Sequence, residues 1–277
     1  MSVKTDASGR RSVQVEVEVP GTPEEVWRAI ATGPGVSSWF VPTEVETDES
    51  GTPVKVLSNF GPGMESVAKV TSWEPPHRFT ADSADLGPEA PSIATEWVVE
   101  ARSGGTCVVR VVHSLFASGD EWDNQLESWE GGWPGFFRLL RLYLTHFSGM
   151  PSSAFQLMAV APEPKAAAWA ALVGPLGLAD AAVGERRSSQ AGAPQLAGQV
   201  EQVGQGEYPE ELLLRVDEPA PGIAHLFAMP MGGKVFLSIR FYLYGDQAAA
   251  AVAREEPLWQ AWMNEHFTAA APADAAC

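Results

Sequence analysis

His113 is the polar side chain that the sequence best places to act on a bound molecule. It lies in the alternating run TCVVRVVHS, where Cys107, Val109 and Val111 share its face and Arg110 lies on the opposite face. Because alternate residues of a strand point to opposite sides, we expect Arg110 outside and His113 inside. An inward imidazole could hydrogen-bond a ligand oxygen or relay a proton. The alternative is a core histidine bonded to a backbone carbonyl or to a glutamate of a packed helix.

Large aromatic residues supply candidate walls for a cavity around this histidine. Five of them, from segments expected to be strands and turns, could line its mouth and walls. The alternative for each is ordinary packing in a core. Together with residues from a strand and a long helix, the candidate ligand-binding set is Trp39, Phe40, Phe60, Trp73, Trp97, Val111, His113, Trp133 and Phe137.

The sequence lacks the residue spacings that metal, nucleotide and hydrolase sites require. The sequence holds five histidines, which are His77, His113, His146, His225 and His266. They form neither an HExxH motif nor a cluster with metal-ligand spacing, and no nucleophile elbow or phosphate-binding loop is found. Glu96 and Glu100 share the strand face opposite Trp97, so we expect solvated carboxylates rather than a catalytic pair. Arg78 is expected to pair with an acidic neighbour. The sequence therefore predicts no catalytic residue, no metal and no cofactor.

The composition narrows the class of partner. Among 277 residues, 35 are acidic and 18 are basic, which gives a net charge of −17 and makes a nucleic acid an unsuitable partner. No apolar run reaches the ~18 residues that a bilayer requires, and the N-terminus lacks the apolar core of a secretory signal. The two cysteines, Cys107 and Cys277, fit a reducing compartment. We expect an acidic, soluble, cytoplasmic protein without a membrane partner, and leave a protein partner open.

The first half reads as a strand, short helices and a meander of strands. Residues 12–19 alternate valine with polar side chains, which is typical of a strand with one buried face. Residues 22–25, TPEE, form a capping box at the start of a short helix that Gly33-Pro34 ends. Turn signals such as Gly104-Gly105 then separate a series of short runs. We predict strands at 43–48, 53–58, 65–73, 78–83, 92–101 and 105–114.

A long amphipathic helix is predicted over residues 120–147. Its apolar face recurs with a period near 3.6, and Gly131, Gly132 and Pro134 are expected to kink or break it. The face consists of Trp133, Phe136, Phe137, Leu140, Tyr143, Leu144 and Phe147.

The second half repeats this order in a shorter form. Trp27 recurs as Trp169 at an offset of 142, whereas His146-Phe147 recurs as His266-Phe267 at an offset of 120, so the second copy lacks 22 residues from its middle. We predict a first domain at 1–148, a reduced second domain at 149–268 and a disordered tail at 269–277. The second domain should keep strands at 210–217, 223–229 and 234–244 and a final helix, with 184–206 as a loop or weak strand.

The motifs of the first half carry a resemblance to a known family. TPEEVWRAI, GVSSWF, PPHRF, GGTCVVRVVHS and GWPGFFRLLRLYLTHF together resemble the START/Bet v 1-like (SRPBCC) helix-grip superfamily, and within it the branch of homologues of the activator of the heat-shock-protein-90 ATPase. The resemblance covers residues 12–148, and 154–268 resembles the fold distantly. It implies an α+β fold in which a curved antiparallel sheet grips a long C-terminal helix, in two tandem copies.

The resemblance also implies a cavity for apolar ligands between the sheet and the long helix. The predicted function is therefore binding of a hydrophobic small molecule, such as a lipid or polyketide, and catalysis is the less favoured outcome. A cyclase or aromatase would need two or three converging polar groups, and His113 with Ser66 or Thr95 are the candidates. A co-chaperone or other protein-interaction module is the third alternative. We expect the first domain to hold the ligand, because the second copy is shorter and its last helix is rich in alanine.

Overall fold

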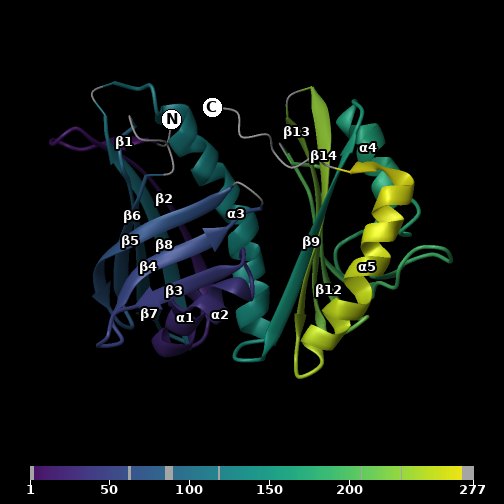
Figure 1. Ribbon diagram of the computed structural model, residues 1–277, viewed down its shortest axis with the longest axis horizontal. Helices are drawn as coiled ribbons and strands as arrows, with labels where there is room; N and C mark the ends of the chain where they lie inside the picture. Colours follow the sequence, from purple (N-terminus) through teal and green to yellow (C-terminus); the bar gives the residue numbers. More distant parts are fainter. Residues whose placement is uncertain are drawn as a thin grey trace. The chain divides into compact units, whose positions relative to one another are not determined.

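The alternating valines of residues 12–19 form the strand β2 (Arg10–Pro20), which organises the first sheet. The computed structural model describes residues 3–61, 64–84, 90–117, 119–206, 208–231 and 233–269. Its chain divides into two compact units, Met1–Gly149 and Met150–Cys277 (Figure 1). This division falls inside the turn at Ser148–Ser153, where the two copies meet in the sequence.

The first unit is one antiparallel sheet with the strand order β1-β2-β8-β7-β6-β5-β4-β3. The first strand of the repeat, β2, lies beside the last, β8, and the other strands follow as a meander. The turn between β7 and β8 is the Gly104-Gly105 pair, whose φ values of 87° and 78° a residue with a side chain rarely adopts. The remaining strands are β1 (Lys4–Thr5), β3 (Thr43–Thr47), β4 (Pro53–Asn59), β5 (Glu65–Glu74), β6 (Arg78–Ser83), β7 (Ile93–Arg102) and β8 (Thr106–Phe116).

Two short helices follow β2. The capping box at Thr22 and Glu25 is present and begins α1 (Pro23–Ala31). The Gly33-Pro34 pair ends α1 as predicted, but it also begins a second helix, α2 (Gly33–Ser37). The hydroxyl of Thr32 makes both possible, because it donates to the Arg28 carbonyl and accepts from the Gly35 N–H.

The long helix α3 (Asp123–His146) packs chiefly against β2. Leu126 lies in one buried cluster with Val13 and Leu115, and the ion pair of Arg11 with Asp123 ties the first turn of the helix to the same strand. Of the kink or break predicted there, the break is wrong, because α3 runs without interruption past Pro134, and the kink stays a prediction. Proline removes one backbone hydrogen bond, and the buried apolar face around it holds the helix together.

The second unit repeats the strand order of the first. Its sheet is also antiparallel, in the order β10-β11-β12-β13-β14-β9-β15, so that the first strand β9 again lies beside the last strand β14. The helices α4 (Lys165–Val173) and α5 (Ala248–His266) cover the same face of this sheet (Figure 1). The strands are β9 (Ser152–Ala161), β10 (Arg186–Ser188), β11 (Ala197–Val203), β12 (Glu211–Glu218), β13 (Gly222–Met231), β14 (Lys234–Tyr244) and β15 (Thr268–Ala269).

The predicted fold class, α+β with two tandem copies of a helix-grip, is confirmed. The second meander is reduced, since β10 to β14 stand where the first unit has β3 to β8. The stretch 184–206 is more ordered than a loop, because it contributes β10 and β11. The tail prediction is wrong at Ala269, which pairs with β9, and its remaining residues, 270–277, lie outside the described residues.

Candidate functional site

A chain of two side-chain hydrogen bonds links the first sheet to α3. Thr95 on β7 and His113 on β8 face each other in register, and Thr95 Oγ1 lies 2.9 Å from His113 Nδ1. On the other side of the ring, the Trp133 indole N–H donates to His113 Nε2 over 2.7 Å. Because Nε2 accepts, the proton of the neutral ring is on Nδ1 and is donated to the threonine oxygen. Both ring nitrogens are therefore in use.

His113 is held as a neutral group. It points toward α3, as its position in the strand predicts, but its partners are a threonine and a tryptophan rather than a backbone carbonyl or a glutamate. Burial lowers the pKa of His113 to about 4, because the charged imidazolium would lose its hydration. At neutral pH the side chain therefore carries no charge, and it would have to give up one of these bonds before it could exchange a proton with a ligand.

Aromatic rings from three parts of the first domain meet around this link. Trp133 of α3 contacts Trp97 of β7 at 5.1 Å edge to face, and stacks on Phe40 at 5.5 Å between ring centroids. Phe137 lies 6.3 Å from Trp97. Trp39 and Phe60 join at the edge of the group, through Trp97 and Phe40 respectively. We call this group the ring cluster: Trp39, Phe40, Phe60, Trp97, Trp133, Phe136 and Phe137.

The ring cluster contains one residue that was not among the predicted site residues. Phe136 lies 4.5 Å from Phe40 and 6.1 Å from Trp133. It stands on the apolar face of the predicted helix, so the helical period alone could have found it. Trp129 is a second such neighbour, with its ring 5.4 Å from that of His113.

The other predicted site residues lie at different depths. Val111 is fully buried between Val15 and Trp97 in register, so it forms part of the inner wall. Phe60 is 42% exposed and marks the solvent end of the ring cluster. Trp39 is buried, and its indole N–H donates to the Ala29 carbonyl. This hydrogen bond ties Trp39 to α1.

Trp73 stands apart from the rings on α3. Its ring contacts Trp27 and Phe79, each at 5.1 Å. The stacking of Phe79 on Trp97, at 6.2 Å, connects it with the ring cluster. Trp73 therefore belongs to the packing beneath α1.

Several charged residues of the first sheet are paired on its outer side. Arg78 pairs with Glu96 at 2.7 Å, so the predicted acidic neighbour of Arg78 is Glu96. Arg110 lies outside as predicted and pairs with Glu100 at 2.8 Å, so Glu96 and Glu100 are ion-paired rather than simply solvated. Within the described ranges, no group of three or more His, Cys, Asp or Glu side chains could hold a metal ion. Over the same ranges, no helix is long and apolar enough to cross a membrane.

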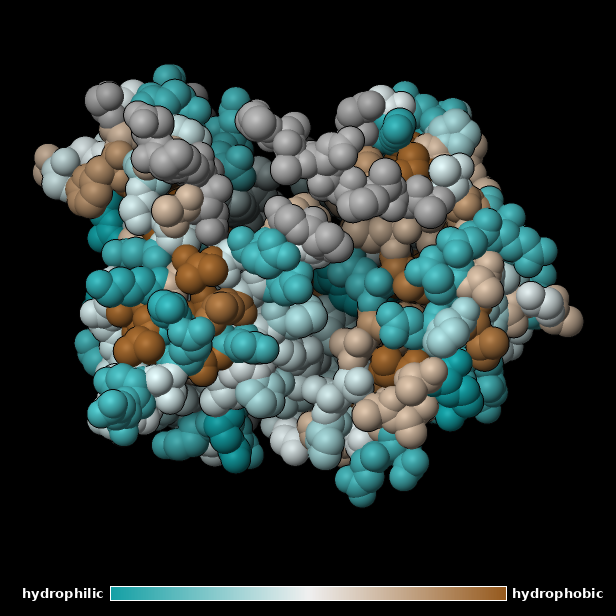
Figure 2. Space-filling view, in the orientation of Figure 1, coloured by the Kyte–Doolittle hydropathy of each residue, from teal (hydrophilic) through white to brown (hydrophobic). Residues whose placement is uncertain are grey.

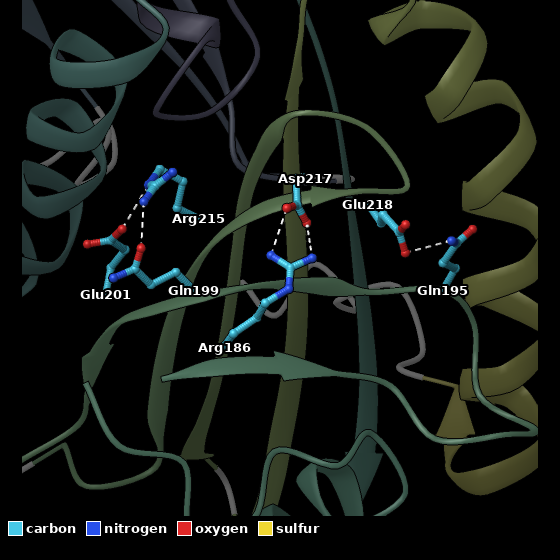
Figure 3. A network of polar contacts seen from close by, with 7 residues as sticks. All are labelled: Arg186, Gln195, Gln199, Glu201, Arg215, Asp217 and Glu218. Carbon is cyan, nitrogen blue, oxygen red and sulfur yellow. Dashed lines mark hydrogen bonds and ion pairs between the residues drawn. The ribbon is translucent and has the colours of Figure 1, made fainter. Parts of the chain in front are cut away.

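The second sheet carries a polar network on β10, β11 and β12, toward one edge of the sheet (Figure 3). Arg215 of β12 donates to Glu201 and Gln199 of β11, over 2.9 and 2.7 Å. Arg186 of β10 forms a bidentate ion pair with Asp217, in which Nη1 lies 2.7 Å from Oδ2 and Nη2 lies 3.0 Å from Oδ1. Arg215 thus meets a carboxylate of the neighbouring strand β11, whereas Arg186 reaches across β11 to a carboxylate of β12. The network is best explained as cross-strand support of the sheet.

The first domain matches a known protein family. Residues 10–138 match the family model described as "Polyketide cyclase / dehydrase and lipid transport". No curated protein with a matching sequence was found. The sequence match and the observed topology confirm the resemblance of the first domain to the START/Bet v 1-like helix-grip superfamily.

Several solved structures are similar at low sequence identity. The di-domain ARO/CYC BexL from the BE-7585A biosynthetic pathway shares 12% identity, with 94% of this chain and 100% of that chain covered and a TM-score of 0.43. DynU16, a putative protein in the dynemicin biosynthetic locus, shares 18%, with 90% and 94% covered and a TM-score of 0.40. The Aha1 dimer from Colwellia psychrerythraea shares 19%, with 50% and 98% covered and a TM-score of 0.38.

Proposed function

We propose that the first domain, a helix-grip domain of the START/Bet v 1-like superfamily, binds a hydrophobic small molecule between its sheet and α3. The observation that carries the proposal is the composition of the ring cluster. Rings contributed by β7, by the turn after α2 and by α3 face one another, and the polar link among them is uncharged. Such a wall suits a ligand that is apolar over most of its surface, such as a lipid or a polyketide.

Binding in this site would draw its free energy from buried surface. Each Å² of apolar area removed from water contributes about 25 cal/mol, against which the costs of association must be set. The link between His113 and Trp133 adds a polar handle. A ligand carbonyl could accept the Trp133 N–H in place of His113 Nε2, and this exchange would orient the ligand without burying a charge.

The proposed ligand contacts are the ring cluster with Val111 and His113. Of the nine residues predicted from the sequence, Trp73 is the least suited to contact the ligand, because its neighbours are Trp27 and Phe79. We assign the ligand to the first domain rather than the second.

A cyclase-type enzyme is the second candidate, favoured by the description of the matching family. Catalysis would require polar groups that converge on the substrate, and Thr95 with His113 form such a pair. With its pKa near 4, His113 would serve as a neutral base or hydrogen-bond donor rather than as a cationic acid. Steady conversion of a bound polyketide that is lost in His113→Leu would establish this function.

The binding proposal is tested by the same substitution at two neighbouring positions of β8, one facing inward and one facing outward. Val111→Trp places a bulky ring on the inner wall, whereas Val112→Trp places the same ring on the outer face of the same strand. We expect Val111→Trp to weaken binding of the neutral fluorophore N-phenyl-1-naphthylamine at least tenfold, and Val112→Trp to leave it unchanged. Equal affinities in the two variants, or equal binding by the isolated second domain, would contradict the proposal. Native mass spectrometry of the purified protein would then identify any ligand that it carries.

A further inference from the structure

The outer face of the first sheet holds a groove that the proposed ligand site does not use. It has a volume of about 470 Å³ and crosses β4, β5 and β6. Figure 2 shows hydrophobic residues gathered among hydrophilic ones over the part of the first unit where Figure 1 labels these neighbouring strands. The groove is lined by Val54, Lys55, Val67, Lys69, Asp82, Ser83, Ala84 and Ser92.

The floor of the groove is apolar and open to solvent. Val54, Val67 and Ala84 supply it, and Val67 is 50% exposed. A half-exposed valine on a sheet face leaves apolar surface in water that a ligand could cover. Ser92 is engaged elsewhere, because its hydroxyl donates to the Ser83 carbonyl.

Two lysines are among the residues that line this groove. Lys55 on β4 and Lys69 on β5 are direct cross-strand partners, and like charges in this arrangement repel each other. Acidic residues flank the pair on both sides, since Glu46 lies opposite Lys55 and Asp82 lies opposite Lys69. Glu46 pairs with Lys55 at 3.2 Å, whereas Lys69 forms no ion pair within the part of the chain that the structure describes. A single anion placed between the two lysines would relieve their repulsion.

We propose that this groove binds a small amphipathic carboxylate. The carboxylate lies between Lys55 and Lys69, and the apolar chain covers Val67 and Ala84. The ligand carries the same sign of charge as the protein as a whole, whose net charge is −17. The adjacent Lys55 and Lys69 supply the local positive charge that the carboxylate needs. The site is independent of the one between the sheet and α3, because Lys55, Lys69 and Asp82 lie on the other face of the sheet.

The proposal is tested on the full chain with decanoate. We expect decanoate to shift the backbone amide resonances of Val67, Lys69 and Asp82 in a saturable way, and less so as the salt concentration rises. Lys69→Gln should weaken binding by roughly three- to tenfold, which is the range for losing one partly screened charge-assisted hydrogen bond. Lys69→Arg keeps the charge and should bind nearly as well.

Two further controls separate this groove from the first site. Decanol lacks the charge, so its affinity should not change in Lys69→Gln. Val111→Trp alters the inner wall and should leave the decanoate shifts at Lys69 intact. The proposal is overturned if decanoate moves only the resonances of β8 and α3, or if Lys69→Gln binds decanoate as the unaltered protein does.

Discussion

In both domains the first strand lies beside the last, and a final helix covers one face of the sheet, but different side chains fill the space beneath that helix. In the first domain, rings such as Trp97, Trp133 and Phe137 meet there around a polar link. In the second, the buried core is built mostly from leucine, valine and alanine, and its rings include Phe155, Phe241, Trp259 and Trp262.

The difference shows that one topology can be filled by two kinds of core. Aliphatic side chains interdigitate closely and leave little room. Flat rings joined edge to face pack with specific geometry, and their N–H groups require partners. Trp133 finds one in His113, whereas Trp259, which is fully buried, has no hydrogen-bond partner for its indole N–H among the described residues.

The largest expected effect comes from removing one ring in each core. Phe137→Ala should lower the free energy of unfolding of the first domain by about 3–5 kcal/mol, and Phe241→Ala should do the same to the second. Hydrogen exchange read by mass spectrometry would follow β8 and β14 separately. Loss of protection in both strands from either substitution would mean that the two domains unfold as one unit.

Acid should destabilise the first domain through His113. Its pKa is about 4 in the folded state and about 6.5 in the unfolded chain, so between these values only the unfolded chain takes up the proton. Stability is therefore complete above pH 6.5 and falls by about 3 kcal/mol as the pH drops to 4. Urea titrations at several pH values would measure this slope, and His113→Gln should remove it. An unchanged slope in His113→Gln would assign the acid sensitivity to other groups.

Replacing a buried tryptophan by phenylalanine should lower the free energy of unfolding by different amounts in the two domains. Trp133→Phe leaves His113 Nε2 without its donor in a buried site, which should cost about 1–3 kcal/mol beyond the loss of ring volume. Trp259→Phe removes a donor that has no partner among the described residues, so only the loss of ring volume should lower the stability. Chemical denaturation of both variants, with exchange data to assign each transition, gives the comparison. Equal costs would remove the energetic distinction between the two indoles.

The smallest expected effect lies on the outer surfaces, where the domains should behave alike. Arg186 and Asp217 in the second domain are more than half exposed, and water and salt screen their ion pair. Asp217→Asn should therefore leave the urea midpoint of the second domain almost unchanged. Glu96→Gln, which breaks the pair with Arg78 in the first domain, is the matched variant and should also have a small effect. A large shift in one of them would reveal a structural role for that pair.

The sequence predicts the fold of the first domain well, because each physical signal there is local. The valine alternation of β2, the capping box at Thr22 and the Gly104-Gly105 turn all act within a few residues. The strands β10 and β11 are harder to predict, since they are held by pairing with β12 and carry few apolar residues, of which Val200 is fully buried. The continuity of α3 past Pro134 likewise depends on contacts that are distant in sequence.

The candidate site is predictable only in part for the same reason. The alternation of side chains along a strand suffices to predict that His113 points inward. Its partners, however, lie 18 and 20 residues away, on another strand and on α3. Nothing local to His113 indicates Trp133 as the donor or Thr95 as the acceptor. The groove on the outer face depends on the register of three strands, which fixes Lys55 opposite Lys69. Such pairings become visible only once the sheet is assembled.

The placement of the first strand beside the last also sets an order of events during synthesis. Arg10 of β2 pairs with Phe116 of β8, so β2 leaves the ribosome long before its main partner exists. The same holds for β9, which waits for β14. During that interval each strand has an unpaired edge, which is the form most prone to associate with other chains. On β2 the outward residues Gln14, Glu16 and Glu18 are polar or charged, and two carboxylates on a waiting strand discourage such association until its domain closes.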